Sequence, residues 1–291
     1  MGHIFVEGTN GGLGNQIFPL MAGISHFYRN LGKFEKPLYF CNENNNKLNS
    51  SFINSLDPDA FKDLIESNFD SYGEKVLIAE KNRNNLKQVW SQVDIQYLEK
   101  SVKPEELGYS IMFSGYLQEA RIIDEKTCQK HLKPSKSVIK KITDQFKDIN
   151  DMVCLQVRRG DYLSEKNLLL YVSITEDWID TVVKKYFPDK KIICISDDPI
   201  WCKKTLIGRG YEIVFPQNLN TVEEFWLQTL TFGNICSPSS FSLAGAMLNP
   251  NLNSVITNPY YKLKSWEDSI GKLIIPDWIK REPINVEMTL D

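Results

Sequence analysis

Hydrophobic positions in this sequence follow two spacings that alternate along the chain. Runs of consecutive apolar residues predict short buried strands, and apolar residues three or four positions apart predict helices with one buried face. In the first half, the predicted strands are residues 3–6, 38–41, 76–79 and 110–115. A helix with apolar positions from Ile17 to Leu31 follows the first strand, and Pro19 fits it only in the first turn, where a missing N–H costs little. The Asn- and Ser-rich stretch 42–54 predicts a loop.

The pattern is sharper in the second half of the chain. The predicted strands are 152–157, 191–196, 211–215, 234–236 and 254–257, and the predicted helices are 138–146, 174–186, 199–207, 222–232 and 241–248. Strands that alternate with helices at this spacing indicate βαβ units and a parallel, doubly wound sheet. A boundary between 134 and 150 separates this part from a first α/β part, and we place it so that the domains are 1–145 and 146–291.

The composition is that of a soluble globular protein. The 291 residues are 42% hydrophobic, and this length is typical of roughly two domains. The net charge, 34 − 37 = −3, argues against a dedicated nucleic-acid binder, which normally carries a basic surplus. No apolar run approaches the roughly 18 residues of a membrane span and no signal-peptide core follows the start, so we expect a cytoplasmic protein. The six cysteines form no C-x-x-C pair, which favours free thiols in a reducing compartment.

The sequence offers little for a metal ion. Its three histidines lie far apart, and nothing near them suggests a metal site. Asp57 and Asp59 flank Pro58 in the D-x-D spelling of metal-dependent sugar transferases. The same residues form a standard helix start, with Pro at the first helical position and Asp before it, and we favour that interpretation.

Polar clusters follow several predicted strands, and ligands of doubly wound sheets bind outside the carboxyl ends of the strands. The first cluster holds Arg158, Arg159, Gly160 and Asp161, directly after the strand 152–157. Paired guanidinium groups suit a phosphate clamp, because each presents a fork of donors to phosphate oxygens. Asp161 either orients one arginine or accepts a hydroxyl proton. The alternative is an Arg–Asp pair that closes a surface turn.

The second cluster is a serine-rich helix start after the strand 234–236. Ser239, Ser240 and Ser242 lie where this helix begins. The free N–H groups and the dipole of a helix start attract anions, which makes this an expected anion site. Simple N-capping by Ser239 or Ser240 is the alternative, and it is compatible with an anion site.

The third cluster is the glycine-rich loop 10–16. Gly12 and Gly14 allow a ligand to approach the backbone closely, and Asn15 and Gln16 bring amides to the start of the helix. The loop lacks the third glycine of the dinucleotide pattern G-x-G-x-x-G, which disfavours an NAD-dependent oxidoreductase. A tight strand-to-helix turn is the alternative.

Two adjacent carboxylates form a further feature at a predicted strand end. Asp197 and Asp198 follow the strand 191–196 and precede a helix that opens with Pro199. One carboxylate could cap that helix while the other reaches a ribose or a base edge. Capping alone is the interpretation that we favour.

Taken together, these clusters resemble glycosyltransferase family 11, the α-1,2-fucosyltransferases. The matching strings, in the order of the family, are 11–16, 115–118, 157–162, 196–198, 239–242 with 248–249, and 275–279. The resemblance implies a GT-B type fold, in which two Rossmann-like, doubly wound domains face each other across a cleft. The first domain would lie on the acceptor side and the second would hold the GDP-sugar.

The resemblance also implies an activity. This is the inverting, metal-independent transfer of L-fucose from GDP-β-L-fucose to the 2-hydroxyl of a terminal galactose, without a cofactor. The implied partners are the nucleotide-sugar donor and a galactose-terminated oligosaccharide acceptor. Peripheral contact with lipid-linked glycans is compatible with this activity, and no nucleic acid takes part.

Roles for the clustered residues follow from the same resemblance. Arg158 or Arg159, with the helix start at Ser239–Ser242, would stabilise the charge of the leaving diphosphate. Asn15 and Gln16 would face the transferred sugar. The other implied donor-binding residues are Gly12, Gly14, Gln156, Asp197, Asp198 and Ser240. Asp161 is the nearest candidate for the catalytic base, and Glu7 and Glu165 are the alternatives.

Departures from the family pattern keep other functions open. Gln156 stands where the family usually has His, residues 243–247 are aliphatic where aromatic residues are usual, and Pro19 replaces a polar or aromatic residue. The amide of Gln156 can hydrogen-bond a nucleoside edge but carries no charge. One alternative is therefore a GT-B transferase for a different nucleotide-activated deoxysugar. Another is a non-catalytic glycan-binding module, against which the intact arginine pair argues.

Overall fold

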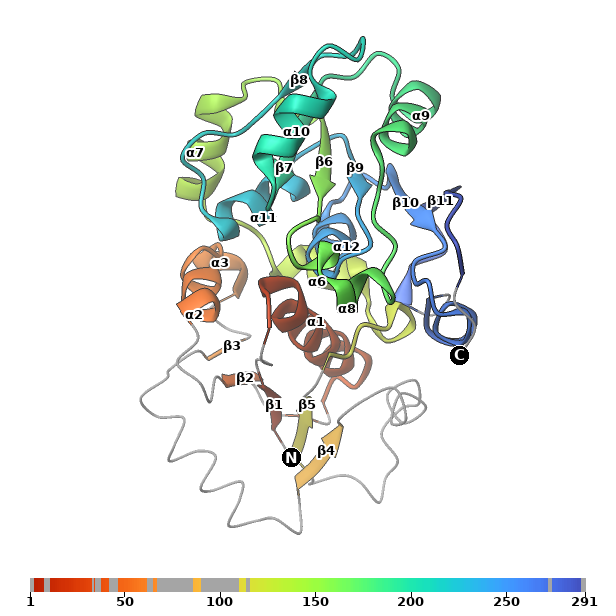
Figure 1. Cartoon of the computed structure of the whole chain (residues 1–291). Helices are drawn as coiled ribbons and strands as arrows, with labels where there is room; N and C mark the ends of the chain where they lie inside the picture. The colour runs from red at the N-terminus through yellow and green to blue at the C-terminus, as the bar shows by residue number, and fades with distance from the viewer. Residues whose placement is uncertain are drawn as a thin grey trace. The chain divides into compact units, whose positions relative to one another are not determined.

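The protein is an α/β chain that divides into two compact units, Met1–Lys136 and Ser137–Asp291 (Figure 1). The structure is a computed structural model, and it describes residues 3–7, 11–32, 34, 38–41, 47–61, 65–66, 86–89, 110–113, 116–271 and 274–288. Each unit contains its own parallel sheet. In the part of the chain that the structure describes, no helix combines the length and apolar character needed to cross a membrane.

The first unit is built on the strand order β3-β2-β1-β5-β4, and the strands are parallel. Its strands are β1 (Ile4–Glu7), β2 (Leu38–Cys41), β3 (Ile65–Glu66), β4 (Leu86–Val89) and β5 (Ser110–Phe113), and its helices are α1 (Leu13–Arg29), α2 (Lys47–Asn54), α3 (Pro58–Phe61) and α6 (Glu125–His131). The expected strands at 3–6, 38–41 and 110–115 are confirmed within the described residues. The expected strand at 76–79 and residues 114–115 lie outside them.

Two expectations for the first unit were wrong. The helix α1 begins at Leu13, so Pro19 is its seventh residue and lies beyond the first turn, where it cannot donate a hydrogen bond to the carbonyl of Asn15. The expected loop 42–54 contains the helix α2 from Lys47 onward. Its residues Phe52 and Ile53 are buried, and this packing outweighs the turn-forming composition of the segment.

The second unit is built on the strand order β11-β10-β9-β6-β7-β8, again parallel throughout. Its strands are β6 (Val153–Val157), β7 (Ile192–Ser196), β8 (Ile213–Val214), β9 (Gly233–Cys236), β10 (Ser254–Asn258) and β11 (Lys280–Pro283). Its helices are α7 (Lys136–Gln145), α8 (Glu165–Leu168), α9 (Glu176–Tyr186), α10 (Pro199–Leu206), α11 (Thr221–Thr229), α12 (Ser240–Leu248) and α13 (Lys264–Trp266). The alternation of strands and helices that the sequence predicted is confirmed, with a shorter β8.

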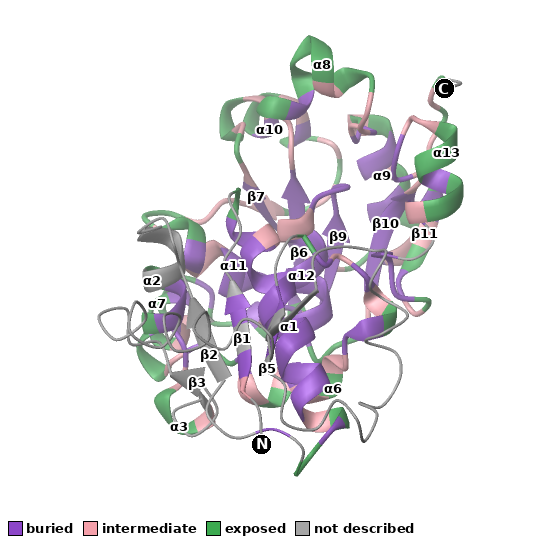
Figure 2. Ribbon diagram, turned by 90° about the horizontal axis from the view of Figure 1, so that it is seen from below, coloured by how far each residue is buried: buried purple, intermediate pink, exposed green. Residues whose placement is uncertain are grey.

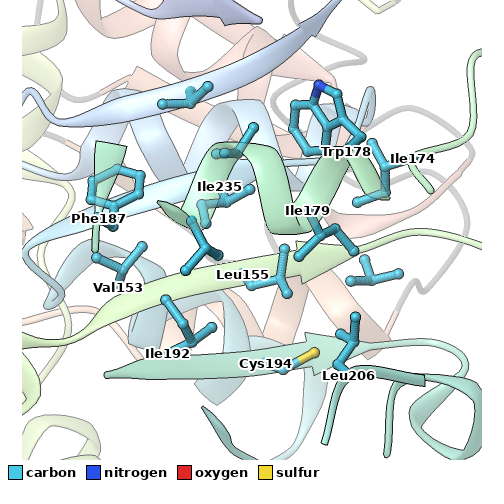
Figure 3. Close-up of a cluster of buried hydrophobic side chains, with 14 of the residues drawn as sticks. Val153, Leu155, Ile174, Trp178, Ile179, Phe187, Ile192, Cys194, Leu206 and Ile235 are labelled. Atoms are coloured by element: carbon cyan, nitrogen blue, oxygen red, sulfur yellow. The ribbon is translucent and has the colours of Figure 1, made fainter. Parts of the chain in front are cut away.

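Helices cover both faces of this second sheet. On one face, strand residues such as Val153, Leu155 and Ile235 pack against Ile179 of α9 and Leu206 of α10, as Figure 3 shows. On the other face, the thiol of Cys236 contacts the carbonyl of Ser242 in α12. Figure 2 shows the central strands buried and α8 largely exposed. Five cysteines of the described residues are buried free thiols, as the sequence predicted: Cys128, Cys154, Cys194, Cys202 and Cys236.

The position of β6 in the sheet sets up the candidate site. It lies between β7 and β9, and all three strands run in the same direction. Their carboxyl ends therefore meet at one edge of the sheet, where the chain continues into Arg158, Asp197 and Ser237.

Candidate active site

Hydrogen bonds join the ends of β6 and β9. The backbone N–H of Arg158 donates to Oγ of Ser237 over 2.9 Å, and that hydroxyl donates to the carbonyl of Gln156 over 2.8 Å. The backbone N–H of Ser237 donates to the same carbonyl over 3.2 Å. The first arginine and the serine-rich segment are thus adjacent, as the strand order requires.

Two carboxylates hold the guanidinium group of Arg158. Its Nη2 lies 2.7 Å from Oδ1 of Asp161, and its Nη1 lies 2.9 Å from Oδ2 of Asp197. The Asp161 side chain is 53% exposed, whereas that of Asp197 is 26% exposed. The expected pairing between Asp161 and an arginine is therefore present, and Asp197 is a second, less exposed partner.

The side chain of Arg159 is more buried than that of Arg158. Its backbone N–H donates to Oδ1 of Asp197 over 2.9 Å, and its Nε lies 3.2 Å from Oδ2 of Asp198. The guanidinium carbon lies 3.8 Å from the centre of the Trp201 ring. The side chain is 17% exposed, against 38% for Arg158.

Asp198 caps α10, as the favoured interpretation predicted. Its Oδ1 accepts the backbone N–H of Trp201 over 3.1 Å. Asp197 contacts residues 158–161, which we call the arginine loop, and a Cβ atom at Gly160 would lie 2.8 Å from its Oδ2. Glycine at this position lets the carboxylate of Asp197 lie against the backbone of that loop.

The serine-rich segment opens α12 next to the arginines. Ser239 is the N-cap, and its hydroxyl accepts the backbone N–H of Ser242 over 3.2 Å. Ser240 is the first helical residue. The buried hydroxyl of Ser242 has no hydrogen-bond partner among the described residues. Gln156, also buried, accepts a long hydrogen bond of 3.5 Å from the Ser239 hydroxyl.

Tyr162 links the arginine loop to the serine-rich segment. Its hydroxyl donates to the carbonyl of Pro238, and its ring stacks on Tyr171 with 4.6 Å between centroids. Burial raises the pKa of Tyr162, so it stays a neutral donor. Hydrogen bonds therefore connect the arginine loop with the serine-rich segment at the carboxyl edge of the sheet.

The glycine-rich loop belongs to the first unit. Gly11 has φ +132°, and a Cβ atom there would lie 2.8 Å from Nδ2 of Asn15. The side chain of Gln118 donates to Oδ1 of Asn15 over 2.7 Å, and Nε2 of Gln16 donates to the carbonyl of Gly11 over 2.8 Å. Gly12 is the N-cap of α1. These contacts support the strand-to-helix turn interpretation.

The remaining candidate residues lie at helix starts or outside the described residues. Gly14 is buried in the first turn of α1, and Glu165 is an exposed residue at the start of α8. Asn10 and Gly115 lie outside the described residues, as does the side chain of Glu7.

The helix-start interpretation of Asp57 is confirmed. Its Oδ1 accepts the backbone N–H of Asp59 over 3.1 Å, and Pro58 is the first residue of α3. Over the described ranges, no group of three or more His, Cys, Asp or Glu side chains is arranged to hold a metal ion.

Sequence reasoning missed Trp201 altogether. It included Ser237 in the serine-rich segment without a role of its own, and the contacts of both residues with the arginines cross between strands. The position of Ser237 directly after a strand was the available signal, because parallel neighbours bring such positions together.

A parallel sheet with paired arginines and a capped helix start at one carboxyl edge is typical of α/β proteins that bind anionic nucleotides. The sequence profile named Glycosyl transferase family 11 matches residues 100–281, and the chain belongs to this family. A search of the curated proteins gives no match.

Solved structures share the fold at low sequence identity. Fucosyltransferase NodZ from Bradyrhizobium matches with a TM-score of 0.54 and 11% identity, over 84% of this chain and 92% of that chain. NodZ α-1,6-fucosyltransferase soaked with GDP-fucose gives 0.52 and 11%, over 86% and 94%. POFUT1 in complex with GDP gives 0.52 and 10%, over 85% and 94%.

Proposed function

We propose that this protein is an inverting fucosyltransferase. It takes L-fucose from GDP-β-L-fucose and transfers it to the 2-hydroxyl of a terminal galactose, with no metal ion. Membership of family 11 supports a glycosyl transfer reaction. Two structures that share the fold are NodZ soaked with GDP-fucose and POFUT1 in complex with GDP. The observation that carries the proposal is the meeting of the arginine pair and the start of α12 at neighbouring strand ends.

In this proposal, the carboxyl edge of the sheet binds the diphosphate that leaves from the donor. Negative charge grows on the β-phosphate as the bond to the sugar breaks, and guanidinium groups with a helix N-terminus stabilise that charge. Arg158 keeps N–H donors beyond those that its two carboxylates engage, because a guanidinium carries five. In our proposal the carboxylates of Asp197 and Asp198 act on the donor through the arginines that they hold.

The acceptor attacks from the face opposite the leaving group, which inverts the configuration at the sugar carbon. Asp161 is our candidate for the base that takes the proton of the 2-hydroxyl, and donor binding would first have to free it from Arg158. In the GT-B arrangement that we propose, the first unit presents the acceptor, with Asn15 and Gln16 facing the transferred sugar. Gln156 would contact the nucleoside through its amide.

A second candidate function differs only in the donor. Gln156 is buried beside Ser239 at the end of β6, so a neutral amide stands where the family usually has His. This supports a transferase for another nucleotide-activated deoxysugar as the alternative.

The test is a transfer assay with the purified full-length chain. GDP-fucose, GDP-mannose, UDP-galactose and dTDP-rhamnose are each incubated with and without a β-galactoside, and released nucleotide is measured. We expect galactoside-dependent release of GDP from GDP-fucose alone, an α-1,2-linked product by NMR, and no effect of EDTA. Turnover of another nucleotide sugar would favour the alternative, and a loss with EDTA that manganese restores would contradict the metal-free reaction.

A further inference from the structure

Trp201 connects the hydrophobic core to the arginine pair. It lies in the first turn of α10, and its side chain packs against the core cluster formed by β6, β7 and α9. The guanidinium group of Arg159 lies over its ring at 3.8 Å. The indole therefore contacts both the hydrophobic core and the cation of Arg159.

Three contacts fix Arg159, and each restrains a different part of it. Asp197 accepts its backbone N–H, Asp198 accepts from its Nε, and the indole of Trp201 covers the face of its guanidinium plane. Among the described residues, neither Nη1 nor Nη2 of Arg159 has a hydrogen-bond acceptor. The plane of the cation is therefore set while its two terminal amino groups remain available.

An aromatic ring suits this role better than a further carboxylate. Asp161, Asp197 and Asp198 already place three negative charges against the two positive charges of the arginine pair. A ring attracts a guanidinium face without using an N–H donor and without cancelling the charge. The contact with Trp201 therefore orients the guanidinium group of Arg159 without adding a fourth negative charge to the three carboxylates.

We propose that Trp201 is a positioning residue for nucleotide binding, which holds the guanidinium plane of Arg159 so that its terminal amino groups face the donor diphosphate. The inference rests on the proposed function, because it assigns the diphosphate of the donor to this edge. It adds that the affinity for GDP depends on Trp201 only through Arg159.

The experiment is a double-mutant cycle on the full-length chain, with GDP affinity measured by calorimetry and folding by thermal denaturation. Trp201→Leu should weaken GDP binding about tenfold, and Trp201→Phe about threefold, because a smaller ring keeps part of the contact. Arg159→Ala should weaken it at least as much as Trp201→Leu. In the Arg159→Ala background, Trp201→Leu should cause no further loss, because its partner is already absent.

Ile200→Ala is the matched control on the same helix. Ile200 is 80% exposed, and its truncation should leave GDP affinity unchanged. Additive losses for Trp201→Leu and Arg159→Ala would overturn the inference, as would unchanged GDP affinity in Trp201→Leu. If Trp201→Leu fails to fold, the cycle with Trp201→Phe decides by the same criterion. A wild-type protein that binds no GDP would instead overturn the proposed function, and the inference with it.

Discussion

Arg158 has one firmly held carboxylate partner and one that solvent reaches. Asp197 is anchored from a second direction by the backbone N–H of Arg159, whereas more than half of Asp161 is exposed. If a diphosphate binds here as proposed, its oxygen would replace the exposed Asp161 at Nη2 rather than Asp197, which also holds the backbone of Arg159. Of the two partners of Arg158, Asp197 is therefore the more firmly held and Asp161 the more easily displaced.

Removing the Arg158 side chain should impair nucleotide binding strongly. We expect Arg158→Ala to weaken GDP binding about 10- to 100-fold, the value of one or two charge-assisted hydrogen bonds. Calorimetry with GDP measures this. Arg209→Ala is the control, because Arg209 also pairs with a carboxylate, that of Asp180, but precedes β8 instead of following a strand at the carboxyl edge. Equal GDP affinity in the two variants would show that Arg158 does not contact the nucleotide.

Asp161→Asn should have opposite effects on binding and on transfer. Loss of its negative charge removes a competitor for Nη2 of Arg158, so GDP should bind about two- to fivefold more tightly at low salt. Transfer to the galactoside should fall, because the candidate base is gone. Calorimetry and the transfer assay measure the two effects separately, and weaker GDP binding would contradict the competition between Asp161 and phosphate.

The sequence identified the arginines and the pairing with Asp161, but not the contacts that reach the arginines from the end of β7, for a physical reason. Arg158 and Asp161 lie three positions apart, so local spacing predicts their contact. Asp197 and Trp201 reach the same arginines from the loop and helix after β7, and only the strand order brings them there. Residues contributed by neighbouring strands cannot be paired from a single sequence until that order is known.

At the scale of elements, α12 combines a structural cap with the proposed anion site. Ser239→Ala removes the acceptor of the Ser242 backbone N–H and should reduce the free energy of unfolding by about 1 kcal/mol. Urea denaturation measures this loss. The same change should weaken GDP binding severalfold, because the helix start becomes less ordered.

Asp124→Ala is the matched control for this cap. Asp124 is the N-cap of α6, where it accepts the backbone N–H of Thr127. Its loss should cost a similar free energy of unfolding and leave GDP affinity unchanged. Equal changes in GDP affinity for both variants would mean that α12 affects binding only through overall stability.

Elements were predicted best where apolar periodicity was strong. The strands β6, β7, β9 and β10 and the helices α9, α10, α11 and α12 fall where the sequence placed them, because buried strands carry long apolar runs. The short exposed helix α8 was not predicted. The helix α2 was missed because Asn and Ser dominate its composition, although Phe52 is buried. Pro19 was misplaced because tertiary packing of α1 tolerates the loss of one helical hydrogen bond.

For the molecule as a whole, Glu224 should make stability depend on pH. Its pKa rises from 4.5 to about 7 in the folded protein because burial disfavours the charged form. Between these values the folded state binds a proton that the unfolded state releases, so stability should fall as pH rises from 4.5 through 7. Glu224→Gln should remove this slope and be about 1 kcal/mol more stable at pH 8, since solvent reaches part of the carboxyl.

Urea denaturation of both proteins between pH 5 and 8 measures this effect. Glu223→Gln is the control, because Glu223 is the neighbouring residue of α11, in the capping box with Asn220. Parallel pH profiles for the wild type and Glu224→Gln would show that Glu224 is not the group responsible.

The contacts of Asp197 limit how the turn 158–161, with its two arginines, could be grafted into another α/β protein. One of its oxygens binds the side chain of Arg158 and the other binds the backbone of Arg159, and Asp197 itself follows β7, 38 positions after Arg159. Residues 158–161 alone would therefore not keep this conformation in another protein. A recipient protein would have to supply an aspartate directly after the adjacent strand. It would also have to keep the glycine that corresponds to Gly160, because a side chain there would collide with this aspartate.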